Sequence, residues 1–346
     1  MAAARWPAPE LERLPASLRP KPGQTLDLIL GTHILLLQTR RGYRSNVDSM
    51  LLPYYASMRA ASTSCFDGSG GAPRRVADLG CGNGLVGILA GKQWPNLVEL
   101  ALFERQESLA ALAQRNLALN GLAQVPDDAT AGGTDARATL HVGDLSEPLA
   151  YPLARFDGVL CNPPFYEGGS GGRSRPATSE KSDAHFESSL GIEGFLGAIA
   201  DMLVLGGRGW LVYDTAESAR LDAAIRAHSS RLELTNVTVK VHVAADDASS
   251  PSSRLLIELL RRDVGNGTAA EQEAASLLGL LGVAAEQQKG APTPPHDTLV
   301  LHAESGCKSY SPPIEEWIER LPPCHYSIRS WDWVGARGAA GGEAHP

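Results

Sequence analysis

Two short stretches of the chain combine residue types that can do chemistry, and each follows an apolar run that predicts a strand. The first is a glycine-rich turn, Asp78-Leu79-Gly80-Cys81-Gly82-Asn83-Gly84. Glycines let the backbone bend sharply and let a ligand approach where a Cβ atom would block it. The spacing is not that of the dinucleotide fingerprint, which binds a pyrophosphate. Asp78 stands ahead of the glycines, and a carboxylate there suits a positively charged ligand better than a phosphate.

Two more carboxylates stand at the ends of the next predicted strands. Glu104 follows Asp78 by 26 residues and ends the second strand, and Asp144 ends the third. The carboxyl ends of parallel strands share one edge of a sheet, where open α/β folds bind ligands. Glu104 is placed to bind ribose hydroxyls and Asp144 an adenine amine, which with the positive charge indicates S-adenosylmethionine. A plain turn is the alternative. We expect the cofactor to bind Asp78, Gly80, Cys81, Gly82, Gly84, Glu104 and Asp144.

The second stretch, Asn162-Pro163-Pro164-Phe165, follows the fourth predicted strand. Proline fixes φ and has no N–H, so the carbonyl before the two prolines is left to accept a hydrogen bond from a substrate. The Asn162 side chain adds a second acceptor, and Phe165 is placed to stack on a planar group. A planar amine held in this way directs its lone pair at a methyl donor, by positioning alone. We expect these four residues to be catalytic, with Asn162 also beside the cofactor; an ordinary turn is the alternative.

The elements around these motifs alternate between strands and helices, which predicts a mostly parallel α/β sheet. The predicted strands are residues 75–79, 98–103, 139–142, 156–161 and 208–213, and the predicted helices are residues 85–93, 106–120 and 192–203. Residues 232–242 and 254–261 are predicted strands with little room for a crossover helix, so they favour an antiparallel hairpin at the sheet edge. Residues 299–302 resume a strand, and residues 34–38 and 45–56 form a strand and a helix ahead of the core.

Composition narrows the class of protein. The chain has 346 residues, 43% of them hydrophobic and 20% charged, which suits one large or two smaller globular domains. A net charge of −8 argues against binding nucleic acid by bulk electrostatics. The five cysteines are odd in number and none are spaced C-x-x-C, which disfavours disulfides and zinc. The longest apolar run, residues 26–37, is too short for a membrane span. We expect a cytoplasmic or organellar protein with no metal and no membrane contact.

Together these motifs resemble class I S-adenosylmethionine-dependent N-methyltransferases of the N-P-P-[FYW] group. More narrowly, the chain is similar to the tRNA1(Val) adenine-37 N6-methyltransferase family, through residues 26–52, the order of the core motifs, and residues 253–258 with 299–310. The resemblance covers roughly residues 25–320 without the insertions. It implies a Rossmann-like seven-stranded fold, S-adenosylmethionine as cofactor, and the N6 amine of adenine in RNA, most of all tRNA, as target.

Phe165 leaves the substrate open, because many members of that family have Tyr at this place. Phe is also found there in rRNA adenine-N6 and guanine-N2 methyltransferases. A second class of enzyme, the N5-glutamine methyltransferases of release factors, holds a planar amide that suits the same motif. About 70 residues precede the first core strand, and they do not predict the helical domain usual in that class. A non-enzymatic RNA-binding module is a third reading, disfavoured by two intact motifs.

Two clusters of cations flank these motifs in sequence and are expected to contact RNA phosphates. They are Arg40, Arg41 and Arg44, and Arg173, Arg175 and Lys181. Solvated surface charge is the alternative, and for Arg44 an ion pair with Asp48 on a helix is another. We expect disorder over residues 1–24 and 331–346, and one methyltransferase domain over residues 25–330 with insertions at 123–136 and 263–297. Trp317, Trp331 and Trp333 either cover a core edge or stack on bases.

Overall fold

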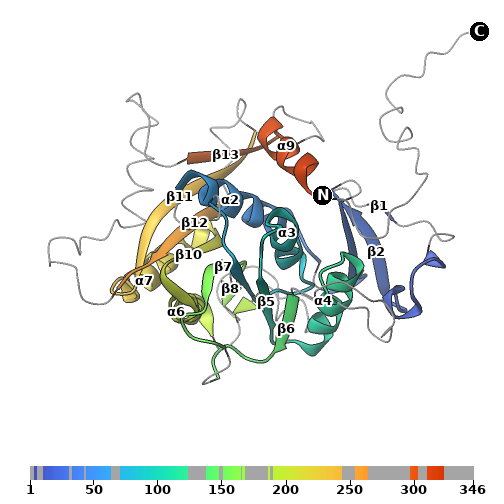
Figure 1. The fold of residues 1–346 in the computed structure, drawn as a ribbon. Coiled ribbons are helices and arrows are strands. Elements are labelled where there is room, and N and C mark those ends of the chain that lie inside the picture. The colour runs from blue at the N-terminus through green and yellow to red at the C-terminus, as the bar shows by residue number, and fades with distance from the viewer. Residues whose placement is uncertain are drawn as a thin grey trace, which may run out of the picture.

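The computed structural model describes residues 4–5, 11–30, 33–42, 44–63, 71–123, 138–147, 151–164, 166–167, 186–187, 190–243, 254–263, 297–302 and 310–322. These residues form an eight-stranded sheet with helices on both faces and a small antiparallel sheet beside it (Figure 1). The predicted insertions and the predicted C-terminal tail lie almost wholly outside the described residues. In the part of the chain that the structure describes, no helix has both the length and the apolar character that a membrane span requires.

The large sheet has the strand order β13-β11-β12-β10-β7-β4-β5-β6. Its strands are β4 (Arg75–Leu79), β5 (Glu99–Glu104), β6 (Ala138–Val142), β7 (Phe156–Cys161), β10 (Leu203–Asp214), β11 (Leu232–Val243), β12 (Arg254–Arg261) and β13 (Asp297–His302). The five strands from β10 to β6 are parallel, and β12 runs antiparallel to β10 and β11. The mostly parallel sheet and its antiparallel hairpin are thus confirmed. The predicted strand near residue 299 adds an eighth member, β13, parallel to β11.

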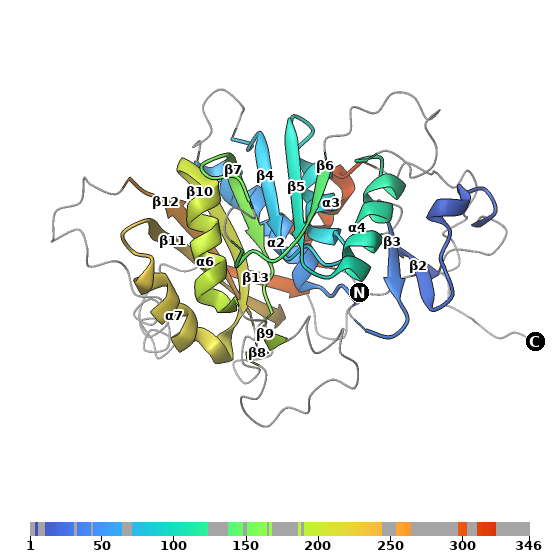
Figure 2. The same ribbon diagram turned by 90° about the horizontal axis from the view of Figure 1, so that it is seen from below.

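Alternate residues of the central strands enter two separate apolar clusters, because a strand points successive side chains to opposite faces. Val76 and Leu102 pack with α2 (Asp48–Thr63), α3 (Leu85–Gln93) and α9 (Pro312–Arg320). Ala77 and Phe103 pack with α6 (Gly191–Met202) and α7 (Ser218–Ala227) on the other face. Figure 2 shows α6 and α2 on opposite sides of the sheet. Burial on both faces explains why these strands are almost wholly apolar.

The small antiparallel sheet precedes the core and was only partly predicted. It consists of β1 (Ala4–Arg5), β2 (Gln24–Ile29) and β3 (Ile34–Thr39). The side chain of Asn116 on α4 (Glu107–Leu119) accepts from the N–H of Leu37 at 2.7 Å and donates to its carbonyl at 3.0 Å. Asn120 pairs with both backbone groups of Leu35 in the same way, at 3.2 and 2.7 Å. Four residues along a helix rise about as far as two residues along a strand, so Asn116 and Asn120 reach Leu37 and Leu35 on the same edge of β3. Their two amides provide hydrogen-bond partners for the backbone N–H and C=O groups of that edge.

The N-terminal segment differs from the prediction of disorder over residues 1–24. Leu14 and Leu18, the latter in the 3-10 helix η1 (Ala16–Leu18), are 2% and 0% exposed and pack with α4. Arg115 on α4 donates to the carbonyl of Ser17 at 2.8 Å. Apolar burial and a buried guanidinium therefore fix residues 11–24 against the core. The prediction of disorder rested on the Pro- and Ala-rich composition and overlooked Leu14 and Leu18, two leucines one helical turn apart.

Helix boundaries shift where side-chain caps decide them. Helix α2 begins at Asp48 and not at the predicted Ser45, because Asn46 Oδ1 accepts from the N–H groups of Asp48 and Ser49. Helices α7 and α9 were not predicted; α7 follows the short helix η2 (Thr215–Glu217) and lies in the connection between β10 and β11. The short strands β8 (Tyr166–Glu167) and β9 (Phe186–Glu187) form a separate parallel pair.

Candidate functional site

A pocket lies at the carboxyl ends of β4, β5, β6 and β7, where the sequence places the candidate cofactor and substrate residues. It holds about 670 Å³ of empty space, part of it open to solvent. Its lining consists of Gly80, Gly82, Phe103, Glu104, Arg105, Gln106, Leu109, Gly143, Asp144, Leu145, Asn162, Pro164, Leu190 and Phe195. The structure therefore brings together the glycine turn, two of the three predicted acids and the Asn-Pro-Pro segment.

The backbone conformation of the turn explains why glycine stands at every second position. Gly80, Gly82 and Gly84 have φ values of 65°, 57° and 87°, all in the left-handed region that other residues adopt only with strain. A Cβ on Gly84 would also lie 3.3 Å from the Cβ of Ala113. The ring of Phe195 lies against Gly80, where an added Cβ would be 3.7 Å from its Cε1. Every second residue of the turn is thus glycine for conformational reasons, and the result is a wall of bare backbone.

Glu104 braces that turn and faces the pocket. Its carboxylate accepts from the N–H of Gly82 at 2.9 Å and from the N–H of Gln106 at 2.8 Å. Burial raises the pKa of this carboxyl group, and the two backbone N–H groups partly oppose the rise. A carboxylate has about four lone-pair sites, so it can still accept from the hydroxyl groups of a bound ligand.

Asp78 does not line the pocket, and neither do Cys81 and Gly84. Asp78 is 1% exposed, and its carboxylate accepts from the N–H of Gly87 in the first turn of α3 at 2.8 Å. Burial raises its pKa to about 7. Burial likewise raises the pKa of the Cys81 thiol. The structure therefore gives Asp78 a contact that supports the helix behind the glycine turn, where the sequence predicted direct contact with a ligand.

Asn162 stands at the other side of the pocket, just beyond the end of β7. The sheet pairing of that strand stops at Cys161, so the backbone leaves the sheet at Asn162. The side-chain Nδ2 donates to the hydroxyl of Ser49 in α2 at 3.2 Å. Among the described residues nothing bonds its Oδ1, which is left to accept from a ligand. Phe165, Arg173, Arg175 and Lys181 lie outside the described residues.

Several pocket residues escaped the sequence analysis. Arg105 and Gln106 directly follow Glu104, so their position could have been inferred from it. Phe195 comes from α6, and only tertiary packing brings it to the turn.

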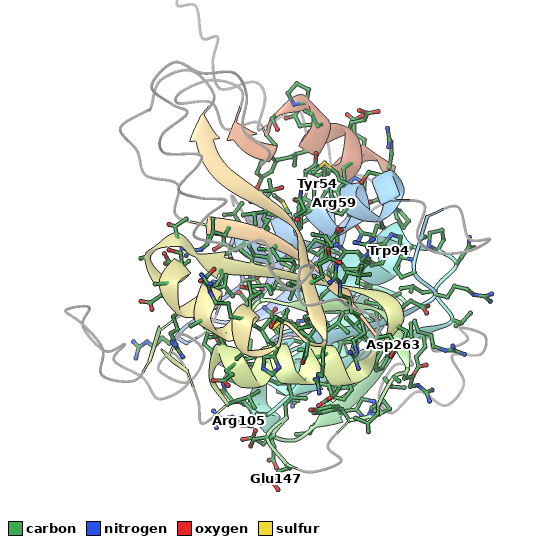
Figure 3. The ribbon with its side chains drawn as sticks, turned by 90° about the vertical axis from the view of Figure 1, so that its left-hand side faces the viewer. Tyr54, Arg59, Trp94, Arg105, Glu147 and Asp263 are labelled. Carbon is green, nitrogen blue, oxygen red and sulfur yellow. The ribbon has the colours of Figure 1, made fainter. Side chains whose placement is uncertain are left out.

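The carboxylate of Asp144 accepts from the N–H and hydroxyl of Ser146, which lowers its pKa, and Arg105 contributes to the lowering. Arg105 lies at the end of the molecule away from Tyr54 (Figure 3).

Arg44 and Asp48 do not pair with each other. Arg44 forms an ion pair with Asp27 in β2 at 2.5 Å and donates to the carbonyl of Thr39 at 2.9 Å. Asp48 pairs with Arg254 in β12 at 2.7 Å. Arg44 therefore fastens the small sheet to the segment ahead of α2. Its neighbours Arg40 and Arg41 are exposed.

Trp317 covers a core edge, which is one of the two roles predicted for it; the other was stacking on bases. It is buried, donates to the side chain of Gln93 at 3.1 Å, and meets the ring of Tyr54 edge-on with centroids 5.4 Å apart. Trp331 and Trp333 lie outside the described residues. In the described part of the chain, no group of three or more His, Cys, Asp or Glu side chains could hold a metal ion.

Comparison with known proteins supports the class indicated by this fold. Residues 63–175 match the model of the methyltransferase small domain. The chain is 27% identical over 129 residues to a tRNA1(Val) (adenine(37)-N6)-methyltransferase of Citrobacter koseri, covering 37% of this chain and 46% of the relative. It is 35% identical over 92 residues to a ribosomal RNA large subunit methyltransferase G of Erwinia tasmaniensis, covering 27% and 21%. The chain thus spans less than half the length of these relatives.

Among solved structures, the chain is similar to a predicted O-methyltransferase of Agrobacterium tumefaciens, with a TM-score of 0.46 and 20% identity over 77% of this chain and 96% of that one. The strand order and the matched domain define a class I methyltransferase fold. In sequence, the chain is similar to class I methyltransferases, among them the tRNA1(Val) adenine-N6 methyltransferases.

Proposed function

We propose that this protein transfers a methyl group from S-adenosylmethionine to the exocyclic N6 amine of adenine in RNA, with tRNA as the substrate. The observation that carries the proposal is one pocket that joins the Glu104-braced glycine turn to Asn162. The matched methyltransferase domain and the RNA-modifying relatives support it. Within the described residues the lining contains no histidine or lysine, which suits a reaction that depends on positioning.

The residues present fit the cofactor. Glu104 keeps lone pairs for the ribose hydroxyls, and Asp144 lies on the same edge for the adenine amine. Phe103, Leu109 and Phe195 supply apolar surface for a planar ring. The left-handed glycines leave the backbone open to close approach. When bound, S-adenosylmethionine supplies an electrophilic methyl group on a sulfonium.

Asn162 is proposed to hold the target amine. Its Oδ1 accepts one N–H of that amine, which keeps the nitrogen in place with its lone pair directed into the pocket. The chain's contribution is then orientation and a polar environment prepared in advance, and these are large effects when water is excluded. Phe165 is proposed to stack on the base, as predicted from the sequence.

The exposed cations Lys21, Arg40 and Arg41 are proposed to contact RNA phosphates. They gather at one end of the small sheet, because Gln24 at the start of β2 pairs with Thr39 at the end of β3. The segment that follows reaches the glycine turn, where the Ser45 hydroxyl donates to the Asn83 side chain at 2.7 Å. Phosphate contacts position a nucleic acid without reading its sequence. Arg173 and Arg175 remain proposed phosphate contacts on the sequence argument alone.

Methyl transfer from isotopically labelled S-adenosylmethionine tests the proposal. The full chain is offered total tRNA, ribosomal RNA and purified release factor in parallel, and the RNA products are digested and identified by nucleoside mass spectrometry. Label in N6-methyladenosine from tRNA is the expected result, and Asn162→Ala should abolish it. Label confined to ribosomal RNA, to a guanine nucleoside or to a glutamine of the release factor would replace the proposed substrate. No transfer to any of the three would contradict the proposed function.

A further inference from the structure

The orientation of the Asn162 side chain depends on helix α2, which is remote from it in sequence. We infer that Ser49 is a positioning residue, whose hydroxyl fixes the Asn162 amide so that its oxygen faces the target amine. This inference rests on the proposed function and adds to it a residue that does not line the pocket. Ser49 is 1% exposed, and its hydroxyl lies 3.2 Å from Asn162 Nδ2.

A carboxamide has a donor end and an acceptor end of nearly the same shape, so its orientation must be set by its partners. The target amine donates, and it needs the oxygen of Asn162. In the structure the amide has this orientation, with its NH₂ group towards α2, where it donates to the Ser49 hydroxyl. The Ser49 hydroxyl is the acceptor that engages the donor end of the amide, since Asn162 Nδ2 donates to it at 3.2 Å.

The first turn of α2 is itself held in place by an ion pair network. Arg254 in β12 donates to Asp48 at 2.7 Å and to Asp214 in β10 at 2.9 Å. Both carboxylates are buried, and Asp214 also accepts from the N–H of Ala216 at 2.9 Å. Figure 1 shows α2 lying beside β7, β10 and β12, with which it is in contact. Because Asp48 precedes Ser49, the network fixes the hydroxyl relative to β10, which pairs with β7, the strand that leads to Asn162.

The first measurement examines the contact without cofactor or RNA. Protein labelled with ¹⁵N at asparagine shows the side-chain amide signals, and the signal lost in Asn162→Ala identifies Asn162. We expect Ser49→Ala to shift this signal and to speed the solvent exchange of its protons. The matched control is Ser62→Ala near the other end of α2, where the hydroxyl is exposed and donates to the carbonyl of Arg59. An Asn162 signal that stays unchanged in Ser49→Ala would overturn the inference.

The second measurement separates positioning from general stability. We expect Ser49→Ala to lower kcat roughly tenfold, with the Kd of S-adenosylmethionine, the KM for RNA and the Tm within about twofold or a few degrees of the parent. Equal losses in kcat, cofactor affinity and Tm would contradict a positioning role, as would a kcat close to that of the parent. If Ser49→Ala does not fold, Arg254→Lys replaces it, since lysine keeps the charge but lacks the two separate nitrogens that contact Asp48 and Asp214. A wild-type chain inactive on every substrate would defeat the proposed function, while the amide signal would still decide the contact.

Discussion

The carboxylate of Glu104 accepts a hydrogen bond from the backbone N–H of Gly82 at 2.9 Å and thereby ties the end of β5 to the glycine turn after β4. The two residues belong to neighbouring parallel strands, whose ends the sheet brings to one edge. The same side chain lines the pocket. One carboxylate thus shapes the backbone wall of the site and offers acceptors to a ligand.

Glu104→Gln is expected to weaken S-adenosylmethionine binding roughly 10- to 100-fold. The amide keeps the size of the side chain but loses the charge, and its NH₂ group would meet one of the two backbone N–H groups that now donate to it. Isothermal titration calorimetry gives the Kd directly. Glu107→Gln, an exposed change in the first turn of α4, is the control and should leave the Kd unchanged. An unaltered Kd in Glu104→Gln would place the cofactor elsewhere.

Asp78 is expected to make stability fall as pH rises. Burial raises its pKa from 3.8 to about 7, so the folded chain binds this proton more tightly than the unfolded chain between those values. Stability from this group is therefore present at acidic pH and lost as pH rises towards 7, on the order of a few kcal/mol. Urea unfolding at pH 5 and pH 8 measures the difference.

Asp78→Asn should flatten that pH dependence, because asparagine can still accept from the Gly87 N–H but has no proton to lose. Asp144→Asn is a control from the same edge of the sheet. The pKa of Asp144 is lowered, so its contribution is lost only as pH falls through the acidic range, outside this window. A variant at position 78 that keeps the parent's slope between pH 5 and pH 8 would refute the assignment.

Charge reversal at Arg40 and Arg41 is expected to weaken RNA binding at low salt. Each lost phosphate contact should also reduce the slope of log K against log salt by about 1. Fluorescence anisotropy with labelled tRNA at several salt concentrations gives both quantities. Arg74→Glu, an exposed change directly before β4 and so at the end of the parallel strands away from the pocket, is the control. Equal slopes for the parent and the double variant would exclude this surface from the RNA interface.

Local patterns predicted the core strands well and the tertiary contacts poorly. Residues 75–79 and 156–161 form strands with the predicted bounds, because an apolar run between polar or glycine residues is a local signal. The contact between Ser49 and Asn162 joins residues 113 apart, and that between Asp48 and Arg254 joins residues 206 apart. No local pattern reports such pairs.

The site was predicted in outline for the same reason. Strand ends placed Glu104, Asp144 and Asn162 at one edge, and the structure puts all three in one pocket. Asp78 shares that edge but turns towards α3, because the N–H of Gly87 offers its carboxylate a buried partner. The direction of a side chain at a strand end depends on the element packed behind it, and spacing alone does not reveal this.

Asn116→Ala is expected to destabilise the fold by about 2–4 kcal/mol. The change removes two hydrogen bonds to the backbone of Leu37 and one to the carbonyl of Asn83, and it leaves buried polar groups without partners. Urea unfolding measures the loss, and hydrogen exchange should show faster exchange of the Leu37 amide. Asn116→Asp is the informative companion, because it keeps the acceptor for the Leu37 N–H but loses the donor to both carbonyls. It should therefore protect the Leu37 amide better than alanine does, while remaining less stable than the parent. Equal stability of Asn116→Ala and the parent would mean that apolar contacts alone hold the small sheet against α4.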